Sequence, residues 1–122
     1  MSRSSQLRIV DILDRIDAIR SAEAQLEASH RSGDDAGYRI AFDAILYDLV
    51  VIGEAVKELP ASVTHLRPDV PWSKVARIRD VLAHHYYKVD IEVIQMTLNE
   101  PLGILQAACG ELVLLTEDDQ VD

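Results

Sequence analysis

The chain has 122 residues, of which 48% are hydrophobic, and its formal net charge at pH 7 is −9. This length and hydrophobic content are sufficient to bury a core, and they exclude an intrinsically disordered chain. We therefore expect one domain over residues 1–122, with an acidic tail at 117–122 that frays. The net negative charge argues against broad, charge-driven binding of nucleic acid.

The cysteine content and the first residues predict a cytoplasmic protein. Cys109 is the only cysteine, so no intramolecular disulfide can form, which suits a reducing compartment. The opening residues Met-Ser-Arg-Ser-Ser-Gln are polar and do not resemble a signal peptide. No apolar run approaches the ~20 residues that span a bilayer. Cys109 lies among leucines and alanines, which predicts a small core residue and not a nucleophile.

The first predicted element is a helix that begins after a cap at Ser4 or Ser5 and runs to about Ser29. Its apolar stripe consists of Ile9, Ile12, Leu13, Ile16, Ile19 and Leu26. A turn follows at 32–35, where Asp34 or Asp35 can cap the next helix.

The second predicted helix, at about 35–59, has the clearest pattern in the chain. Apolar residues recur at alternating intervals of four and three, which indicates a helix packed along its whole length. They are Tyr38, Phe42, Ile45, Leu49, Ile52, Val56 and Leu59. Further apolar residues at 46, 50 and 51 predict contacts on more than one side. Gly53 costs about 1 kcal/mol relative to Ala in a helix interior, so close approach of another helix is expected there.

The remaining elements are also helical, which predicts an all-α, antiparallel bundle of four to five helices. Pro60 ends the second helix, and residues 60–71 form a loop with one short helical turn at 61–66. A helix then begins at Pro71 or Trp72, with apolar residues at 75, 78, 81 and 82. A last helical region runs from a cap at Asp90 to about 115. Pro101 either kinks it or begins a new helix that Asn99 caps.

The helix that begins at Trp72 concentrates the reactive side chains of the chain. Arg79 is followed after four intervening residues by His84, and two positions later by Tyr86. An arginine offers a planar, permanently charged fork that matches phosphate oxygens. A histidine, with an unperturbed pKa of about 6.5, can take or give a proton near neutral pH. Together they suit RNA cleavage, which needs a proton removed from a 2′-hydroxyl and charge stabilised at phosphorus.

The spacing of these residues allows several interpretations of how they are arranged. Five residues along a helix rotate by about 140°, so Arg79 and His84 do not share a face, whereas Arg79 and Tyr86 do. Either the helix ends near His84, or the two residues line adjacent walls of a cleft, which two copies of the chain could form. On spacing alone, roles in packing or hydrogen bonding remain open. Metal binding by His84 and His85 is disfavoured, because adjacent helical residues point about 100° apart.

The distribution of charge supports a local phosphate contact. Residues 65–88 are the basic part of an otherwise acidic or neutral chain, and residues 89–122 contain no Lys or Arg. The cations of this basic island are Arg67, Lys74, Arg77, Arg79 and Lys88. The acidic remainder could equally bind a basic protein partner.

The run Ile-Arg-Asp-Val-Leu-Ala-His-His-Tyr-Tyr at 78–87 resembles the R-x4-H-x-Y signature of HepT-like toxins, a branch of the HEPN superfamily. The segment Tyr-Asp-Leu-Val-Val-Ile-Gly-Glu-Ala-Val-Lys at 47–57 resembles the central helix of the same family. Trp72 and residues 89–94 also fit, so the resemblance extends from about Ile9 to Leu115. It implies a HEPN-like helical bundle, a homodimer with facing motif segments, and an endoribonuclease that needs no metal or other cofactor.

The resemblance also assigns roles to single residues. It implies that Arg79 stabilises charge at phosphorus and that His84 is the general acid and base. Tyr86 would receive AMP from a cognate nucleotidyltransferase antitoxin, which silences the toxin in a type VII toxin–antitoxin system. Asp80 could support the site by orienting Arg79 or His84, although its charge repels phosphate. The alternative is a non-catalytic helical adaptor or a nucleotide-binding dimerisation module.

Overall fold

The computed structural model describes residues 4–85, 94, 97 and 99–116. These residues form helices α1 (Ser5–Ser32), α2 (Asp35–Lys57), α3 (Ala61–Thr64), α4 (Trp72–His85) and α6 (Glu100–Leu115). The described part of the chain contains no strand. The predicted all-α helical bundle is therefore confirmed. None of the described helices is both long enough and apolar enough to cross a membrane.

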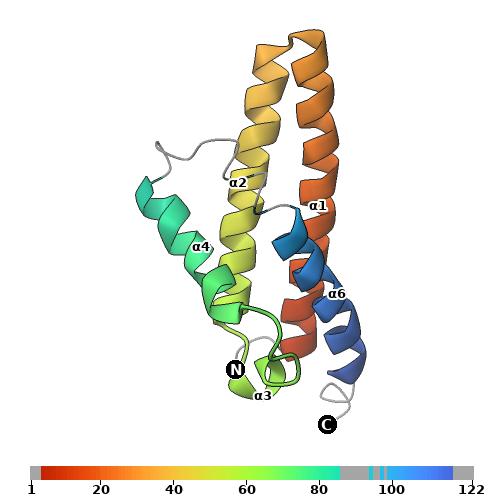
Figure 1. Ribbon diagram of the computed structural model, residues 1–122, viewed down its shortest axis with the longest axis vertical. Helices are drawn as coiled ribbons and strands as arrows, with labels where there is room; N and C mark the ends of the chain where they lie inside the picture. The colour runs from red at the N-terminus through yellow and green to blue at the C-terminus, as the bar shows by residue number, and fades with distance from the viewer. Residues whose placement is uncertain (1–3, 86–93, 95–96, 98, 117–122) are drawn as a thin grey trace.

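Helices α1 and α2 form a long antiparallel pair that runs through the molecule (Figure 1). Ser4 caps α1, since its hydroxyl accepts a hydrogen bond from the backbone N–H of Leu7 at 3.3 Å. Asp34 caps α2 in the same way through the N–H of Gly37 at 3.0 Å. The first helix extends three residues beyond the predicted end at Ser29. It ends where Gly33 adopts a left-handed conformation with φ of 72°, which residues with a side chain rarely reach.

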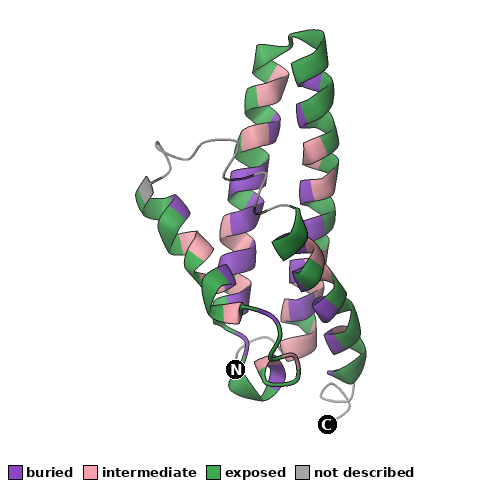
Figure 2. Cartoon of the chain, viewed as in Figure 1, coloured by how far each residue is buried: buried purple, intermediate pink, exposed green. Residues whose placement is uncertain are grey.

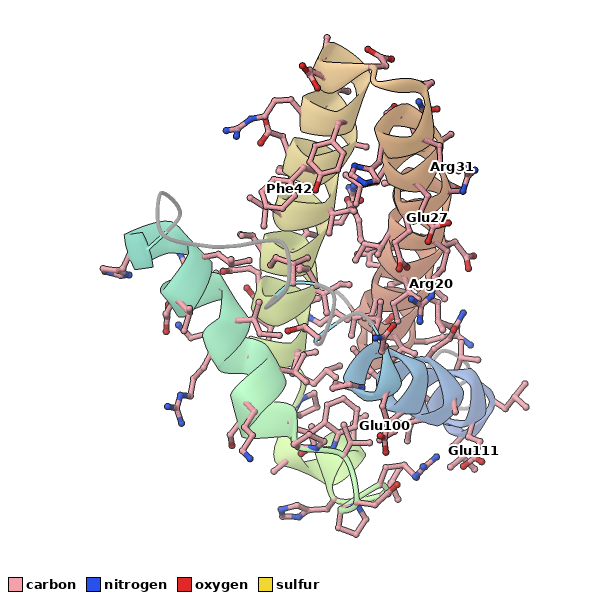
Figure 3. The ribbon with its side chains drawn as sticks, turned by 45° about the horizontal axis from the view of Figure 1, so that its top comes forward. Arg20, Glu27, Arg31, Phe42, Glu100 and Glu111 are labelled. Atoms are coloured by element: carbon pink, nitrogen blue, oxygen red, sulfur yellow. The ribbon has the colours of Figure 1, made fainter. Side chains whose placement is uncertain are left out.

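The core lies between these helices, where their buried faces meet (Figure 2). The predicted apolar stripes supply most of it: fully or nearly fully buried residues include Ile9, Ile12, Ile16 and Ile19 of α1 and Ile45, Leu49, Ile52 and Val56 of α2. Helix α6 adds the buried residues Leu102, Leu105 and Leu112. Tyr38 and Phe42 pack against this cluster as partly buried residues. Charged side chains occupy the outside, such as the ion pair of Glu27 and Arg31 on α1 (Figure 3).

Helix α2 contacts both α1 and α4, and α6 packs on α1 (Figure 1). This confirms the prediction that α2 is covered on more than one side. Helix α4 buries Val75 and Leu82 against the core, but Val81, which the sequence placed in the same stripe, is 52% exposed. Helix α4 contacts the rest of the protein mainly through α2, so an apolar side chain of α4 that does not face α2 stays exposed.

Hydrogen bonds and ion pairs hold the second part of the segment between α2 and α4 in place. The indole N–H of Trp72 donates to the backbone carbonyl oxygens of Thr64 at 3.1 Å and Arg67 at 2.9 Å. The Arg67 guanidinium pairs with Asp69 at 2.8 Å and with Glu111 of α6, also at 2.8 Å. These contacts fix where α4 begins relative to the rest of the bundle.

Helix α6 begins at Glu100 with Pro101 in its first turn, so the proline starts a helix and does not kink one. Proline is tolerated there because the first backbone N–H groups of a helix have no partner within it. Asn99 precedes the helix as predicted, but its side chain makes no capping hydrogen bond. The predicted cap at Asp90 lies outside the described residues.

Candidate active site

The described residues of the motif lie in the second half of α4. Arg79 is half-buried, while Asp80 and His84 are exposed. Tyr86 lies outside the described residues, so its predicted place beside Arg79 stays a prediction. Asp80 contacts both Arg79 and His84, and Arg79 also contacts Glu54 of α2.

Gly53 sets the distance between α2 and α4 at this point. A Cβ atom at position 53 would lie 3.0 Å from the backbone nitrogen of Arg79, 3.1 Å from its Cβ and 3.3 Å from the carbonyl oxygen of Ala76. These are backbone or near-backbone atoms, which cannot turn aside as a flexible side chain would. The predicted close approach of another helix at Gly53 is confirmed, and the helix is the one that carries the motif.

Two carboxylates surround the Arg79 guanidinium. Its Nε lies 2.6 Å from Oε2 of Glu54, and its Nη1 donates to Oδ1 of Asp80 at 3.2 Å. The Arg79 side chain is 40% exposed, so part of the guanidinium remains accessible from solvent. An arginine has five N–H donors, and two single contacts do not use them all. The remaining N–H groups can donate to a phosphate once the negative charge beside them is reduced.

His84 is held from one side of its ring. Its Nδ1 lies 2.8 Å from the backbone carbonyl oxygen of Asp80, one helical turn earlier. Because a carbonyl oxygen can only accept, Nδ1 is the donor, and in the neutral imidazole Nε2 is then the basic nitrogen. The side chain is exposed, so Nε2 is available to take a proton from a bound molecule.

Asp80 links the two motif residues through different atoms. Its carboxylate contacts Arg79, and its backbone carbonyl contacts His84. The sequence left open whether Asp80 orients the arginine or the histidine, and the structure has contacts to both. Helix α4 thus carries a permanent cation, Arg79, and an exposed base, His84, and Asp80 contacts both of them.

The cations of the basic island at residues 65–88 differ in their surroundings in the structure. Arg67 and Arg79 are paired with carboxylates, whereas Lys74 and Arg77 are exposed on α4. Lys74 and Arg77 also line a pocket of about 320 Å³, whose apolar wall includes Leu49 of α2. The surface next to the motif thus combines two cations with an apolar hollow.

Other reactive groups are poorly placed for chemistry. Cys109 is fully buried, and burial raises the pKa of its thiol to about 12, so it stays protonated at neutral pH. Its predicted role as a core residue is confirmed. Within the described ranges, no group of three or more His, Cys, Asp or Glu side chains is arranged to hold a metal ion.

The described residues thus form an all-α helical bundle whose motif helix presents an arginine and a histidine, as the resemblance to HEPN domains implied. Residues 9–112 match the family described as ribonuclease HepT-like, and the chain belongs to that family.

Its relatives carry corresponding names. It is 40% identical over 69 residues to "Probable ribonuclease HepT" of Thermococcus cleftensis. This alignment covers 57% of this chain and 63% of the relative. The chain is 49% identical over 51 residues to a "Putative RNase" of Methanocaldococcus jannaschii, 42% of each chain. The aligned region thus spans less than two thirds of either relative. No solved structure matches the chain significantly.

Sequence reasoning did not single out Glu54 as a residue of the site. Glu54 and Arg79 are 25 positions apart, and nothing in helical periodicity relates them. The one available signal was Gly53, which marked the place where another helix approaches α2.

Proposed function

We propose that the chain is a metal-independent endoribonuclease and the toxin of a type VII toxin–antitoxin pair. The observation that carries the proposal is the linkage of Arg79 and His84 through Asp80, which leaves Nε2 of His84 exposed. Membership of the ribonuclease HepT-like family supports it. The acidic net charge is no obstacle, since the proposed contact with RNA is local to α4.

The proposed reaction uses the two groups in sequence. Nε2 of His84 takes the proton of an RNA 2′-hydroxyl, and the 2′-oxygen attacks the adjacent phosphorus. Arg79 stabilises the negative charge that develops on the phosphoryl oxygens. The bond to the 5′-oxygen breaks, and the imidazolium returns its proton to that leaving oxygen. The products are a 2′,3′-cyclic phosphate and a free 5′-hydroxyl, and no metal ion is required.

We further propose that two copies of the chain form the working cleft. Arg79 and His84 lie five residues apart on one continuous helix, so their directions differ by about 140°. A two-fold axis that brings the second halves of two α4 helices together would surround one phosphate with both kinds of side chain. Sedimentation at micromolar concentration is expected to show a dimer, and a monomer alone would contradict the proposed cleft.

Neutralisation is proposed to occur by transfer of AMP to Tyr86 by a cognate nucleotidyltransferase. The support is positional, because a residue seven places after Arg79 lies within about 20° of it if the helix continues. An added phosphate would bring negative charge and acceptor oxygens to the guanidinium that should hold RNA. Co-expression with the nucleotidyltransferase and peptide mass spectrometry would test this. AMP on Tyr87 alone would show that the residue assignment is wrong.

The central experiment is RNA cleavage by the purified protein in the presence of EDTA. The wild-type chain is expected to cleave, and the double variant Arg79→Ala/His84→Ala is expected not to. In cells, expression should slow growth, and His84→Ala should relieve this while the protein stays folded. His85→Ala is the control and should remain toxic. A wild-type protein that binds a partner but never cuts RNA would favour the non-catalytic adaptor.

A further inference from the structure

We propose that Glu54 is a positioning residue that holds Arg79 where negative charge develops at phosphorus, an inference that rests on the proposed ribonuclease function. Glu54 makes the closer of the two carboxylate contacts to Arg79, at 2.6 Å against 3.2 Å for Asp80. Its contact is to Nε, at the side of the guanidinium nearest the helix. The outer part of the fork, with Nη1 and Nη2, is then the part that meets RNA.

The origin of the two carboxylates distinguishes their roles. Asp80 lies next to Arg79 on α4 and moves with it, so it cannot fix the arginine relative to the rest of the protein. Glu54 lies on α2, a helix packed against α1 along the core. Gly53, the preceding residue, brings the backbone of Arg79 against α2 and so presents Glu54 to the guanidinium. Only Glu54, of these two, ties Arg79 to the core.

The charge balance supports the same division. Two carboxylates against one guanidinium leave the group with a net negative charge, which disfavours phosphate unless one of the carboxylates withdraws. Asp80 is the candidate to withdraw, because its side chain is 55% exposed and its contact is longer. Phosphate can replace it at Nη1 while Glu54 keeps its place at Nε. A bidentate contact of the outer fork then becomes available.

Glu58, the residue that caps the C-terminal end of α2, provides a control. It lies one turn after Glu54, its side chain has a similar exposure of 45% against 48%, and it pairs with Arg8 of α1 at 2.5 Å. The Glu54–Arg79 pair is part-exposed on both sides, and such pairs contribute little to stability. Arg8, the partner of Glu58, is only 13% exposed, but glutamine at position 58 keeps an amide oxygen that can accept its hydrogen bond. Glu54→Gln and Glu58→Gln should therefore both fold with nearly unchanged melting temperatures. The two variants remove the same charge, and only the first removes it from the proposed site.

Kinetics of RNA cleavage separate the two variants. Glu54→Gln is expected to lower kcat by about 10- to 100-fold, because small errors in the position of a catalytic group are costly. KM should change little, since the proposed role of Arg79 is realised mainly as charge develops at phosphorus. Glu58→Gln should cleave like the wild type. In an Arg79→Ala background, Glu54→Gln should have no further effect.

A second measurement does not depend on activity. In ¹⁵N-labelled protein, the Nε–H signal of Arg79, assigned by its loss in Arg79→Ala, should shift in Glu54→Gln and stay in place in Glu58→Gln. An unmoved signal, or a Glu54→Gln variant that cleaves as fast as the wild type, would overturn the inference. A wild-type protein that does not cleave RNA would instead overturn the proposed function, whatever the Arg79 signal does.

Discussion

Gly53→Ala tests how closely the motif helix must approach the core. The added Cβ would meet three atoms of α4 at 3.0 to 3.3 Å, which is closer than ordinary van der Waals contact. These atoms belong to the backbone or its first side-chain carbon, so α4 has to move outward by a few tenths of an ångström. Overpacking of this kind costs about 1–3 kcal/mol. Alanine offsets about 1 kcal/mol of that through its higher helix propensity.

The net expectation is a loss of about 0–2 kcal/mol in the free energy of unfolding. An unfolding entropy of about 2.1 cal/mol/K per residue over 122 residues converts this to a melting temperature lower by about 0–8 °C. The protein should stay folded, but Arg79 would move away from Glu54. RNA cleavage should therefore fall by about 10-fold, although nearly all of the protein remains folded.

Gly110→Ala is the matched control for this change. Gly110 also lies within a helix, and a Cβ atom there would meet nothing within 4 Å. The substitution should raise the melting temperature by about 2–4 °C through helix propensity alone, and RNA cleavage should not change. If Gly53→Ala stabilises the protein as much as Gly110→Ala and cleaves RNA normally, the close approach does not control the site.

Three further predictions concern the fold. Ile45→Ala removes a fully buried side chain of α2 and should lower the free energy of unfolding by about 2–5 kcal/mol. Ile40→Ala, at a position 70% exposed, should change it by less than about 0.5 kcal/mol. Equal effects of the two variants in denaturant titrations would contradict the assigned core. The Arg67 guanidinium lowers the pKa of Asp69 below its ordinary value of 3.8, so this contact stabilises the folded state fully above that pH and the stabilisation is lost as the pH falls through the lowered pKa. The difference in melting temperature between wild type and Arg67→Ala should therefore stay constant above pH 3.8 and shrink as the pH falls below it. The Cys109 thiol should resist a thiol reagent at pH 8 and react after denaturation, because it is buried and its pKa is raised to about 12; rapid modification of the folded protein would show that α6 is misplaced.

The local elements could be predicted because their causes are local in the chain. Ser4, Asp34 and Pro60 mark helix ends through their own hydrogen bonds or ring geometry. The alternating spacing from Tyr38 to Leu59 located the buried face of α2 in the same way. The candidate residues Arg79 and His84 were also visible, because their chemistry depends on side-chain type and on spacing within one helix.

Helical periodicity indicates which face is apolar, but it does not identify the helix that covers this face. For that reason Val81 was expected in the buried stripe and is exposed. A separate error concerned the end of the first helix, which is set by the left-handed conformation of Gly33.

Contacts between helices depended on the tertiary structure alone. The sequence predicted that some helix approaches Gly53, and only the structure identifies it as α4, with Arg79 at the point of contact. The pairing of Glu54 with Arg79 follows from that packing, since two side chains on separate helices meet only when the distance and register of the helices are set. The sequence by itself thus determined which chemical groups the motif offers. Their environment was decided by how α2 and α4 pack, because that packing places a carboxylate from one helix against the cation of the other.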